Sequence, residues 1–221
     1  AQFPEVQVTL GEFSAELLCS ASELIVSPGI SIQSPAIEAA RAAGAAISGD
    51  IDIFSRAVSK PVVAVTGSNG KSTVVTLLAA MATKAGLRVG LGGNLDGAQA
   101  APALDLLRQD EKDLYILELS SFQLETTVCL AARAAVILNV SDDHMDRYAD
   151  KQEYEAAKQR IFNGAQCAIV NRDEPSSAPW DKGAVIASSF GTSKPERGQW
   201  GVIEQDGEAV LVLGDELVLR A

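Results

Sequence analysis

Short apolar runs alternate with helical patterns along most of this chain. Runs rich in Val, Ile and Leu are typical of buried strands, whereas apolar residues three and four positions apart are typical of helices. The predicted strands are residues 24–26, 45–47, 62–65, 87–91, 114–117, 135–140 and 168–170, and the predicted helices are residues 35–43, 50–57, 71–85 and 150–162. This alternation predicts an α/β fold with a mostly parallel sheet flanked by helices.

The helix predicted over residues 71–85 carries its larger apolar side chains on one face. They are Val74, Leu77, Leu78, Met81 and Ala85, and their spacing matches the turn of a helix. This periodicity is the main support for the helix.

The pattern restarts near Ser59-Lys60-Pro61, which predicts a domain boundary between residues 1–59 and 60–221. After Gly183 the apolar runs become short and are separated by turn signals such as Asp206-Gly207. These runs, at residues 185–186, 201–203, 209–213 and 217–219, predict a small antiparallel β appendage.

Composition narrows the possible ligands. The formal net charge is −11, so we expect no nucleic acid partner, and an anionic ligand must be held by a local arrangement of donors. The three cysteines lie far apart among apolar neighbours, which predicts reduced, buried thiols of a cytoplasmic protein. No apolar run approaches the ~18 residues of a membrane-spanning helix, so we expect no membrane insertion.

The run Val62-Val-Ala-Val-Thr-Gly-Ser-Asn-Gly-Lys-Ser-Thr73 leads from a strand through a glycine-rich turn into a helix. Backbone N–H groups of such a turn and the positive end of the helix dipole bind phosphate. Lys71 would reach the phosphates, and the hydroxyl of Ser72 or Thr73 would help to coordinate Mg²⁺. The two glycines, Gly67 and Gly70, are separated by two residues, where the general P-loop has four. A plain strand-to-helix connection is the alternative.

Three further residues are candidates for metal chemistry. Glu118 ends an apolar strand, where ligands gather in open α/β sheets, although it could be a salt-bridged acid at a strand end. His144 is the only histidine and follows another strand among aspartates, although a lone histidine is more often structural. Lys158 shares a helix face with apolar residues, and a lysine that extends along that face to solvent is the simpler interpretation.

Four motifs together resemble the Mur ligase family. They are Thr66-Gly-Ser-Asn-Gly-Lys-Ser-Thr73, Glu118-Leu-Ser-Ser-Phe-Gln-Leu-Glu125, Asn139-Val-Ser-Asp-Asp-His-Met-Asp-Arg-Tyr148 and Ala156-Ala-Lys-Gln-Arg-Ile161. The form of the second and third is similar to that of the members that add D-glutamate to UDP-N-acetylmuramoyl-L-alanine. Ser27-Pro28-Gly29 and residues 48–52 match the end of the first domain in those members.

The resemblance implies the following roles. ATP phosphates would lie on Gly67, Ser68, Asn69, Gly70, Lys71, Ser72 and Thr73. One Mg²⁺ would be held by Ser72 and Glu118, and a second by His144 and a carbamylated Lys158. The substrate would contact Ser27, Pro28, Gly29, Asn94, Ser120 and His144. Catalysis would depend on Lys71, His144 and Lys158. Residues 1–59 would be the remnant of a Rossmann-like domain that binds the UDP-substrate, and residues 60–221 the central ATP-binding domain of a monomeric protein.

The implied reaction is ATP-dependent amide formation. The carboxylate of the L-alanine residue would attack the γ-phosphate, and the amine of D-glutamate would then displace phosphate from the acyl phosphate. Such a ligase would serve peptidoglycan precursor synthesis, and hence cell wall biogenesis, cell shape and cell division, in the cytoplasm.

Three departures from the family pattern keep other functions open. The loop Gly93-Asn-Leu-Asp-Gly-Ala-Gln-Ala-Ala-Pro102 is about four residues longer than usual and includes an added acid, Asp96. The glycine-rich start of the first domain and the C-terminal domain that holds D-glutamate are missing, so we expect the isolated chain not to complete a ligation. The alternatives are another amino-acid ligase, such as another Mur ligase or a folylpolyglutamate synthase, and a catalytically silent nucleotide-binding module.

Overall fold

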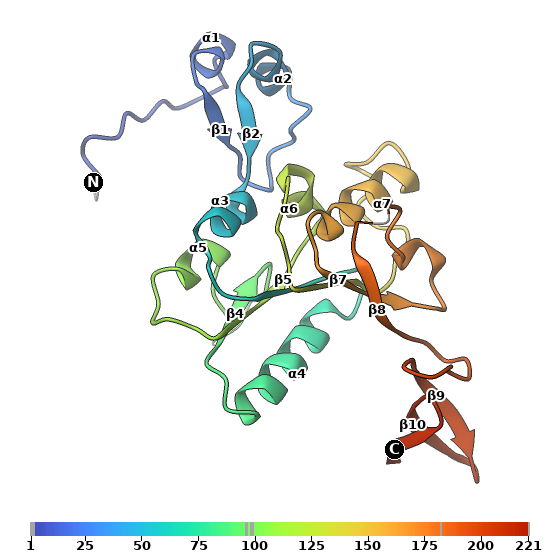
Figure 1. The fold of residues 1–221 in the computed structure, drawn as a ribbon. Coiled ribbons are helices and arrows are strands. Elements are labelled where there is room, and N and C mark those ends of the chain that lie inside the picture. Colours follow the sequence, from blue (N-terminus) through green and yellow to red (C-terminus); the bar gives the residue numbers. More distant parts are fainter. Residues whose placement is uncertain (1–2, 96, 98–99, 182, 221) are drawn as a thin grey trace.

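A six-stranded parallel sheet forms the centre of the computed structural model, which describes residues 3–95, 97, 100–181 and 183–220 (Figure 1). The strand order is β4-β5-β3-β6-β7-β8. The strands are β3 (Val62–Thr66), β4 (Val89–Gly93), β5 (Leu114–Glu118), β6 (Ala134–Ile137), β7 (Cys167–Asn171) and β8 (Val185–Phe190). The predicted α/β fold with a mostly parallel sheet is therefore confirmed.

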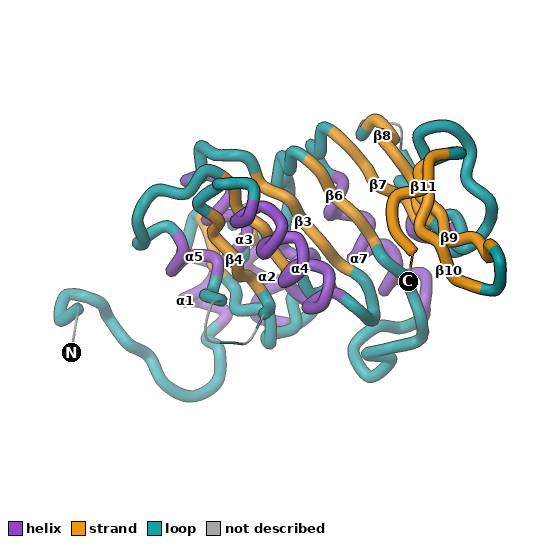
Figure 2. Tube along the Cα trace, turned by 90° about the horizontal axis from the view of Figure 1, so that it is seen from below, coloured by secondary structure: helices purple, strands orange, loops and turns teal. Residues whose placement is uncertain are grey.

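Helices cover both faces of this sheet (Figures 1 and 2). One face carries α4 (Lys71–Lys84). The other carries α3 (Asp50–Ala57), α5 (Ala103–Leu106), α6 (Ser121–Thr126) and α7 (Lys151–Gln159), which a 3₁₀ turn over Arg160–Phe162 extends. Because side chains alternate along a strand, Ala64 and Leu117 pack in one core cluster and Val65 and Ile116 in the other.

The α4 helix is confirmed, but the predicted apolar face is only partly correct: Val74 and Leu78 pack against the sheet core as partly buried residues. Val75, Ala79 and Ala82 are buried against the sheet. Leu77 and Met81 are 60% and 61% exposed. Small and β-branched side chains let the helix approach the sheet closely. The prediction from the sequence relied on the larger apolar residues instead.

The N-terminal unit is a small parallel pair of strands with helices. It contains α1 (Ala15–Cys19), β1 (Glu23–Ile25), α2 (Pro35–Ala42) and β2 (Ala46–Ser48). β1 pairs with β2 in parallel, as the sequence predicts. The following helix, α3, packs on the large sheet instead, with Ile51 and Phe54 fully buried in its core. Phe54 meets Tyr115 edge to face at 5.4 Å between ring centroids.

The predicted antiparallel appendage is present but smaller than expected. Its strands are β9 (Trp200–Gln205), β10 (Glu208–Leu213) and β11 (Glu216–Arg220), in the order β11-β10-β9. The assignment of residues 185–186 to this appendage is wrong, because they begin β8, which pairs in parallel with β7. A short apolar run does not reveal its partner strand. Among the described residues of the connection from β7 to β8, the one helical element is the 3₁₀ turn Pro175–Ser177.

The cysteines are free thiols, but the prediction that they are buried is wrong. Cys129 is exposed, and Cys19 and Cys167 are partly exposed. Within the part of the chain that the structure describes, no helix is long and apolar enough to cross a membrane.

Candidate functional site

The glycine-rich loop lies at the carboxyl end of β3, in the middle of the sheet. Gly70 has φ of +84° and caps α4 in the left-handed conformation that glycine tolerates. At Gly67, where φ is +154°, an added Cβ would lie 3.1 Å from Cβ of Leu138. The first turn of α4 then directs free N–H groups, with the positive end of the helix dipole, toward the loop. This is the geometry expected of a phosphate-binding loop.

Residues that follow β6 hold this loop in place. The Asn139 side chain accepts a hydrogen bond from the Asn69 N–H at 2.9 Å and donates to the Asn69 carbonyl at 3.0 Å. The Ser68 hydroxyl accepts from the Ser141 N–H at 3.0 Å and lies 3.1 Å from the Tyr154 hydroxyl. The sequence gives no sign of these contacts beyond the polar residues after the strand, and Tyr154 looks like a packing residue on its helix.

Lys71 begins α4 and turns back over the loop. Its ammonium group donates to the carbonyl oxygens of Gly67 at 2.9 Å and Ser68 at 3.1 Å. Both acceptors are neutral, so the positive charge of Lys71 stays uncompensated by these contacts. A polyanion in the loop could therefore attract it.

Ser72 and Glu118 form the strongest candidate for a magnesium site. β5 and β3 are neighbours, and Val65 pairs with Glu118, which brings Glu118 beside the loop. The Ser72 hydroxyl donates to the Glu118 carboxylate at 2.8 Å, and Glu118 is only 2% exposed. Two hard oxygen ligands fit Mg²⁺ whose other ligands are phosphate and water. Among the described residues no three His, Cys, Asp or Glu side chains form a metal cluster.

Lys158 is buried, so it does not extend to solvent as the simpler interpretation of its helix suggested. It is 1% exposed, and its ammonium nitrogen lies 4.4 Å from the ring centroid of Tyr154. Burial, and secondly the charge of Lys71, lower the pKa of Lys158 to about 7, although Asp143 opposes the shift. A neutral amine is therefore accessible near neutral pH. An ammonium group cannot bind a metal, whereas a carbamylated lysine could.

Replacing Lys158 with Met should stabilise the ligand-free chain at low pH. The folded-state pKa of Lys158 is about 7, against an ordinary value of 10.5. The unfolded chain therefore binds more protons between these values, and the stability of the wild type rises with pH across this window. At about pH 6 we expect the free energy of unfolding of Lys158→Met, measured in urea, to exceed that of the wild type by a few kcal/mol. This difference should shrink by about pH 9. A difference that does not depend on pH would contradict this.

His144 lies on the exposed side of the same region. Its φ is +56°, an uncommon conformation for a residue other than glycine. The imidazole centroid is 6.3 Å from that of Tyr154 and 4.8 Å from that of Phe122. His144 and Lys158 thus both adjoin Tyr154. The sequence pattern around Phe122 does not indicate this contact.

Asn94 and Ser120 are positioned by the end of β5. The Asn94 N–H donates to the Glu118 carbonyl at 2.8 Å. Ser120 caps α6, and its hydroxyl accepts from the Gln123 N–H at 3.2 Å in a capping box. The pattern Ser-x-x-Gln could have revealed this cap from the sequence. The added acid Asp96 lies outside the described residues.

Gly93→Ala should be markedly destabilising. Gly93 has φ of +94°, and an added Cβ would collide with the Glu118 carbonyl oxygen. We expect a loss of about 2–4 kcal/mol in urea unfolding, from backbone strain together with displacement of the β5 end. Gly86→Ala is the matched control, because φ is +90° there and nothing lies within 4 Å of the added Cβ. Equal losses in the two variants would show that the collision is relieved without cost.

Ser27, Pro28 and Gly29 form a turn after β1, within the N-terminal unit. The Ile30 N–H donates to the Ser27 carbonyl at 2.9 Å and closes this turn. The structure does not bring these three residues into hydrogen-bond contact with the phosphate loop. The chain beyond them approaches the site, since Arg147 donates to the Ile30 carbonyl at 3.2 Å.

Two family models match this chain. The model described as the Mur ligase middle domain matches residues 65–213. The model described as the Mur ligase MurD-like, N-terminal domain matches residues 1–49.

Curated relatives match along nearly the whole chain. The UDP-N-acetylmuramoylalanine–D-glutamate ligase of Pseudomonas aeruginosa is 53% identical over 208 residues, which are 94% of this chain and 45% of that protein. The ligase of the same name from Marinobacter nauticus is 50% identical over 221 residues, which are 100% of this chain and 48% of that protein. The chain spans about half the length of the curated relatives it matches.

Solved structures share the fold. A UDP-N-acetylmuramate:L-alanyl-γ-D-glutamyl-meso-diaminopimelate ligase from Neisseria meningitides matches with a TM-score of 0.61 at 19% identity, over 94% of this chain and 70% of that one. E. coli FolC, solved in complex with DHPP and ADP, matches with a TM-score of 0.54 at 20% identity, over 76% of this chain and 51% of that one. At these identities the similarity concerns the fold alone.

Proposed function

Because the chain belongs to the Mur ligase family, we propose that its protein is an ATP-dependent ligase that adds D-glutamate to UDP-N-acetylmuramoyl-L-alanine. The names of the curated relatives support the substrate pair. The observation that carries the proposal is the hydrogen-bonded pair of Ser72 and buried Glu118 beside a phosphate-binding loop. We further propose that the reaction is a step of peptidoglycan precursor synthesis in the cytoplasm, carried out by a monomer.

ATP would be held by the glycine-rich loop. Backbone N–H groups of the loop and of the first turn of α4 would bind the phosphates, and Lys71 would leave its two neutral carbonyl partners to bind them as well. Ser72 and Glu118 would hold one Mg²⁺. Bound there, the ion would neutralise charge that develops on the transferred phosphoryl group.

The other candidate residues would handle the acceptor substrate. Asn94, Ser120 and His144 would orient its muramoyl-alanine end, and Ser27 to Gly29 would lie along its UDP-sugar. A carbamylated Lys158 would supply a carboxylate-like ligand, together with His144, for a second Mg²⁺. The buried position of Lys158 and its pKa near 7 support this modification, because only the neutral amine can attack carbon dioxide.

Chemistry of this class activates a carboxylate as an acyl phosphate. The carboxylate of the L-alanine residue attacks the γ-phosphorus, and ADP leaves. The amine of D-glutamate then attacks the acyl carbon, and the tetrahedral intermediate expels phosphate, so that an amide, ADP and phosphate are formed.

We propose that the chain is divided between two domains, at residues 1–59 and 60–221. The separate matches to residues 1–49 and 65–213 support a boundary between Gly49 and Val65. The last helix of residues 1–59, α3, packs in the core of the large sheet and so joins the first unit to the second.

The test is substrate-dependent release of ADP by the protein that carries this chain. With MgATP and UDP-N-acetylmuramoyl-L-alanine, release should require an amino acid and should prefer D-glutamate over L-alanine and L-lysine. Preference for a different amino acid would indicate another ligase of the family. Binding of MgATP without any substrate-dependent release would instead favour a nucleotide-binding module.

A further inference from the structure

The ring of Phe122 is close to two side chains of the segment that follows β6. The His144 imidazole centroid is 4.8 Å from the Phe122 centroid. The guanidinium carbon of Arg147 is 4.1 Å from the same centroid, which is cation–π distance. Phe122 therefore contacts the candidate substrate residue and an arginine at the same time.

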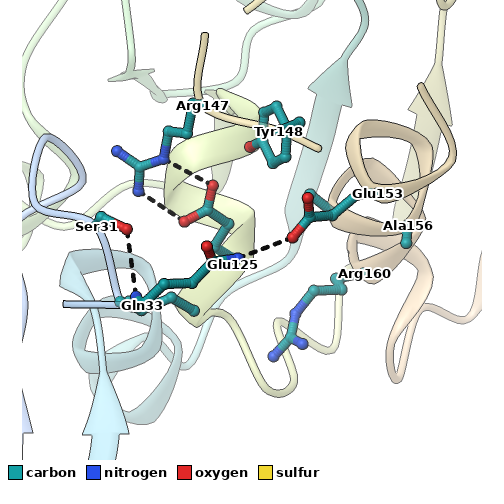
Figure 3. A pocket seen from close by; sticks show the side chains of 10 residues that line it. Ser31, Gln33, Glu125, Arg147, Tyr148, Glu153, Ala156 and Arg160 are labelled. Carbon is teal, nitrogen blue, oxygen red and sulfur yellow. Dashed lines mark hydrogen bonds and ion pairs between the residues drawn. The ribbon is translucent and has the colours of Figure 1, made fainter. Parts of the chain in front are cut away.

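The Arg147 guanidinium is fixed by polar contacts to a helix and to a loop of the N-terminal unit. Its Nε and Nη2 donate to the two carboxylate oxygens of Glu125 on α6, at 3.0 and 2.6 Å (Figure 3). The same Nη2 donates to the Ile30 carbonyl at 3.2 Å, in the N-terminal unit. The side chains of Arg147 and Glu125 are only 14% and 11% exposed. A shielded, bidentate pair of this kind keeps the guanidinium in one orientation.

The backbone of Arg147 also constrains His144. The Arg147 N–H donates to the His144 carbonyl at 2.9 Å, and the Tyr148 N–H donates to it at 3.3 Å. These bonds close a turn in which His144 keeps its left-handed conformation. Such a conformation persists only where the surroundings enforce it.

A second contact between the units lies close to Arg147. The Gln33 amide donates to the Glu153 carboxylate of α7 at 2.9 Å. Gln33, Glu125, Arg147 and Glu153 all line one cavity of about 210 Å³ between the N-terminal unit and helices α6 and α7. The chain after the Ser27-Pro28-Gly29 turn is thus attached to α7 through Gln33 and, through Ile30, to Arg147, which lies in the same segment as His144.

We propose that Arg147 is a positioning residue. It fixes the His144 imidazole through Phe122, and through the Ile30 carbonyl it holds the adjacent Ser27-Pro28-Gly29 turn in place relative to that imidazole. One guanidinium thereby sets the distance between two parts of the acceptor-substrate site. This inference rests on the proposed function, in which both parts contact the same substrate. Lysine could keep the charge opposite Glu125 but could not make the bidentate and stacked contacts together.

The first test measures His144 without requiring any reaction. The chain has one histidine, so the imidazole C–H resonances of an untagged sample report His144 alone. We expect Arg147→Lys to shift these resonances, because ring-current shifts depend on the geometry of Phe122 and His144. The double variant Arg147→Gln with Glu125→Gln should shift them too, without leaving a shielded carboxylate unpaired.

Arg88→Lys is the matched control. Arg88 also forms a bidentate pair, through Nε and Nη2 to Asp113 at 3.0 and 2.7 Å. These two residues immediately precede β4 and β5, so the pair lies at the amino ends of the strands, whereas the candidate site lies at their carboxyl ends. Its replacement should leave the His144 resonances unchanged. Unchanged resonances in both Arg147 variants would overturn the proposal.

The second test separates positioning from general damage in the protein that carries this chain. We expect Arg147→Lys to lower kcat/KM for UDP-N-acetylmuramoyl-L-alanine by about 10²-fold, while KM for ATP stays within about twofold because the phosphate loop is untouched. A KM for ATP that rises by as large a factor as kcat/KM for UDP-N-acetylmuramoyl-L-alanine falls would overturn the positioning role. An unchanged kcat/KM for UDP-N-acetylmuramoyl-L-alanine would overturn it too. If the wild type shows no ligation, the proposed function fails, and the His144 resonances then decide the inference.

Discussion

Lys71→Ala is expected to lower substrate-dependent ADP release by about 10³-fold, because it removes the charge that would follow the transferred phosphoryl group. The ammonium group of Lys71 is held over the loop by two carbonyl oxygens, so it is already within reach of a bound polyanion. Isothermal titration with MgATP should show weaker binding as well, and circular dichroism should show an unchanged fold.

Lys84→Ala is the control for this variant. Lys84 ends the same helix, at the far end from the loop. Its loss removes one positive charge from α4 without approaching the phosphates, so we expect turnover within about twofold of the wild type. If Lys71→Ala and Lys84→Ala behaved alike, the loop would not be the phosphate site.

Lys158→Met is expected to lower the rate of ligation by about 10²–10³-fold. The same substitution should stabilise the ligand-free chain at low pH. Opposite effects on stability and activity would arise from one cause. A buried amine is costly to charge, and the same burial keeps it neutral enough to react with carbon dioxide. Samples equilibrated with ¹³C-bicarbonate should show a carbamate carbon signal in the wild type that Lys158→Met lacks.

The dependence on pH gives a second check of this modification. Because the pKa of Lys158 is lowered to about 7, the neutral amine becomes abundant as the pH rises through about 7, and the carbamate signal should grow over the same range. Lys151→Met is a suitable control, since Lys151 begins the same helix and has a solvent-exposed side chain. A signal that survives in Lys158→Met would place the carbamate elsewhere.

Local signals in the sequence were enough to predict most elements and the phosphate loop. Glycines that interrupt a strand-to-helix transition act through the backbone of a few adjacent residues, and apolar periodicity acts within one helix or strand. For this reason the limits of α3, β3 and α4 are close to those predicted. The limits of β6 are less so, since the strand ends at Ile137 although the apolar run continues to Val140.

Contacts between distant residues could not be predicted in this way. The face with which α4 packs and the partner of β8 depend on the shape of the sheet, which no local pattern encodes. The same holds for Tyr154, whose hydroxyl meets Ser68 eighty-six positions away. The bridge from Ile30 through Arg147 to Phe122 joins three segments and has no counterpart in any single motif.

Short runs of residues carry enough information to predict the type of fold, a candidate phosphate-binding loop and the family. How these runs combine in space depends on the packing of the whole chain. β3 lies between β5 and β6, which brings Glu118 to Ser72 on one side and Asn139 to Asn69 on the other. Packing of α7 buried Lys158, and it is this burial, not the identity of the residue, that lowers its pKa into the range where its chemistry can change.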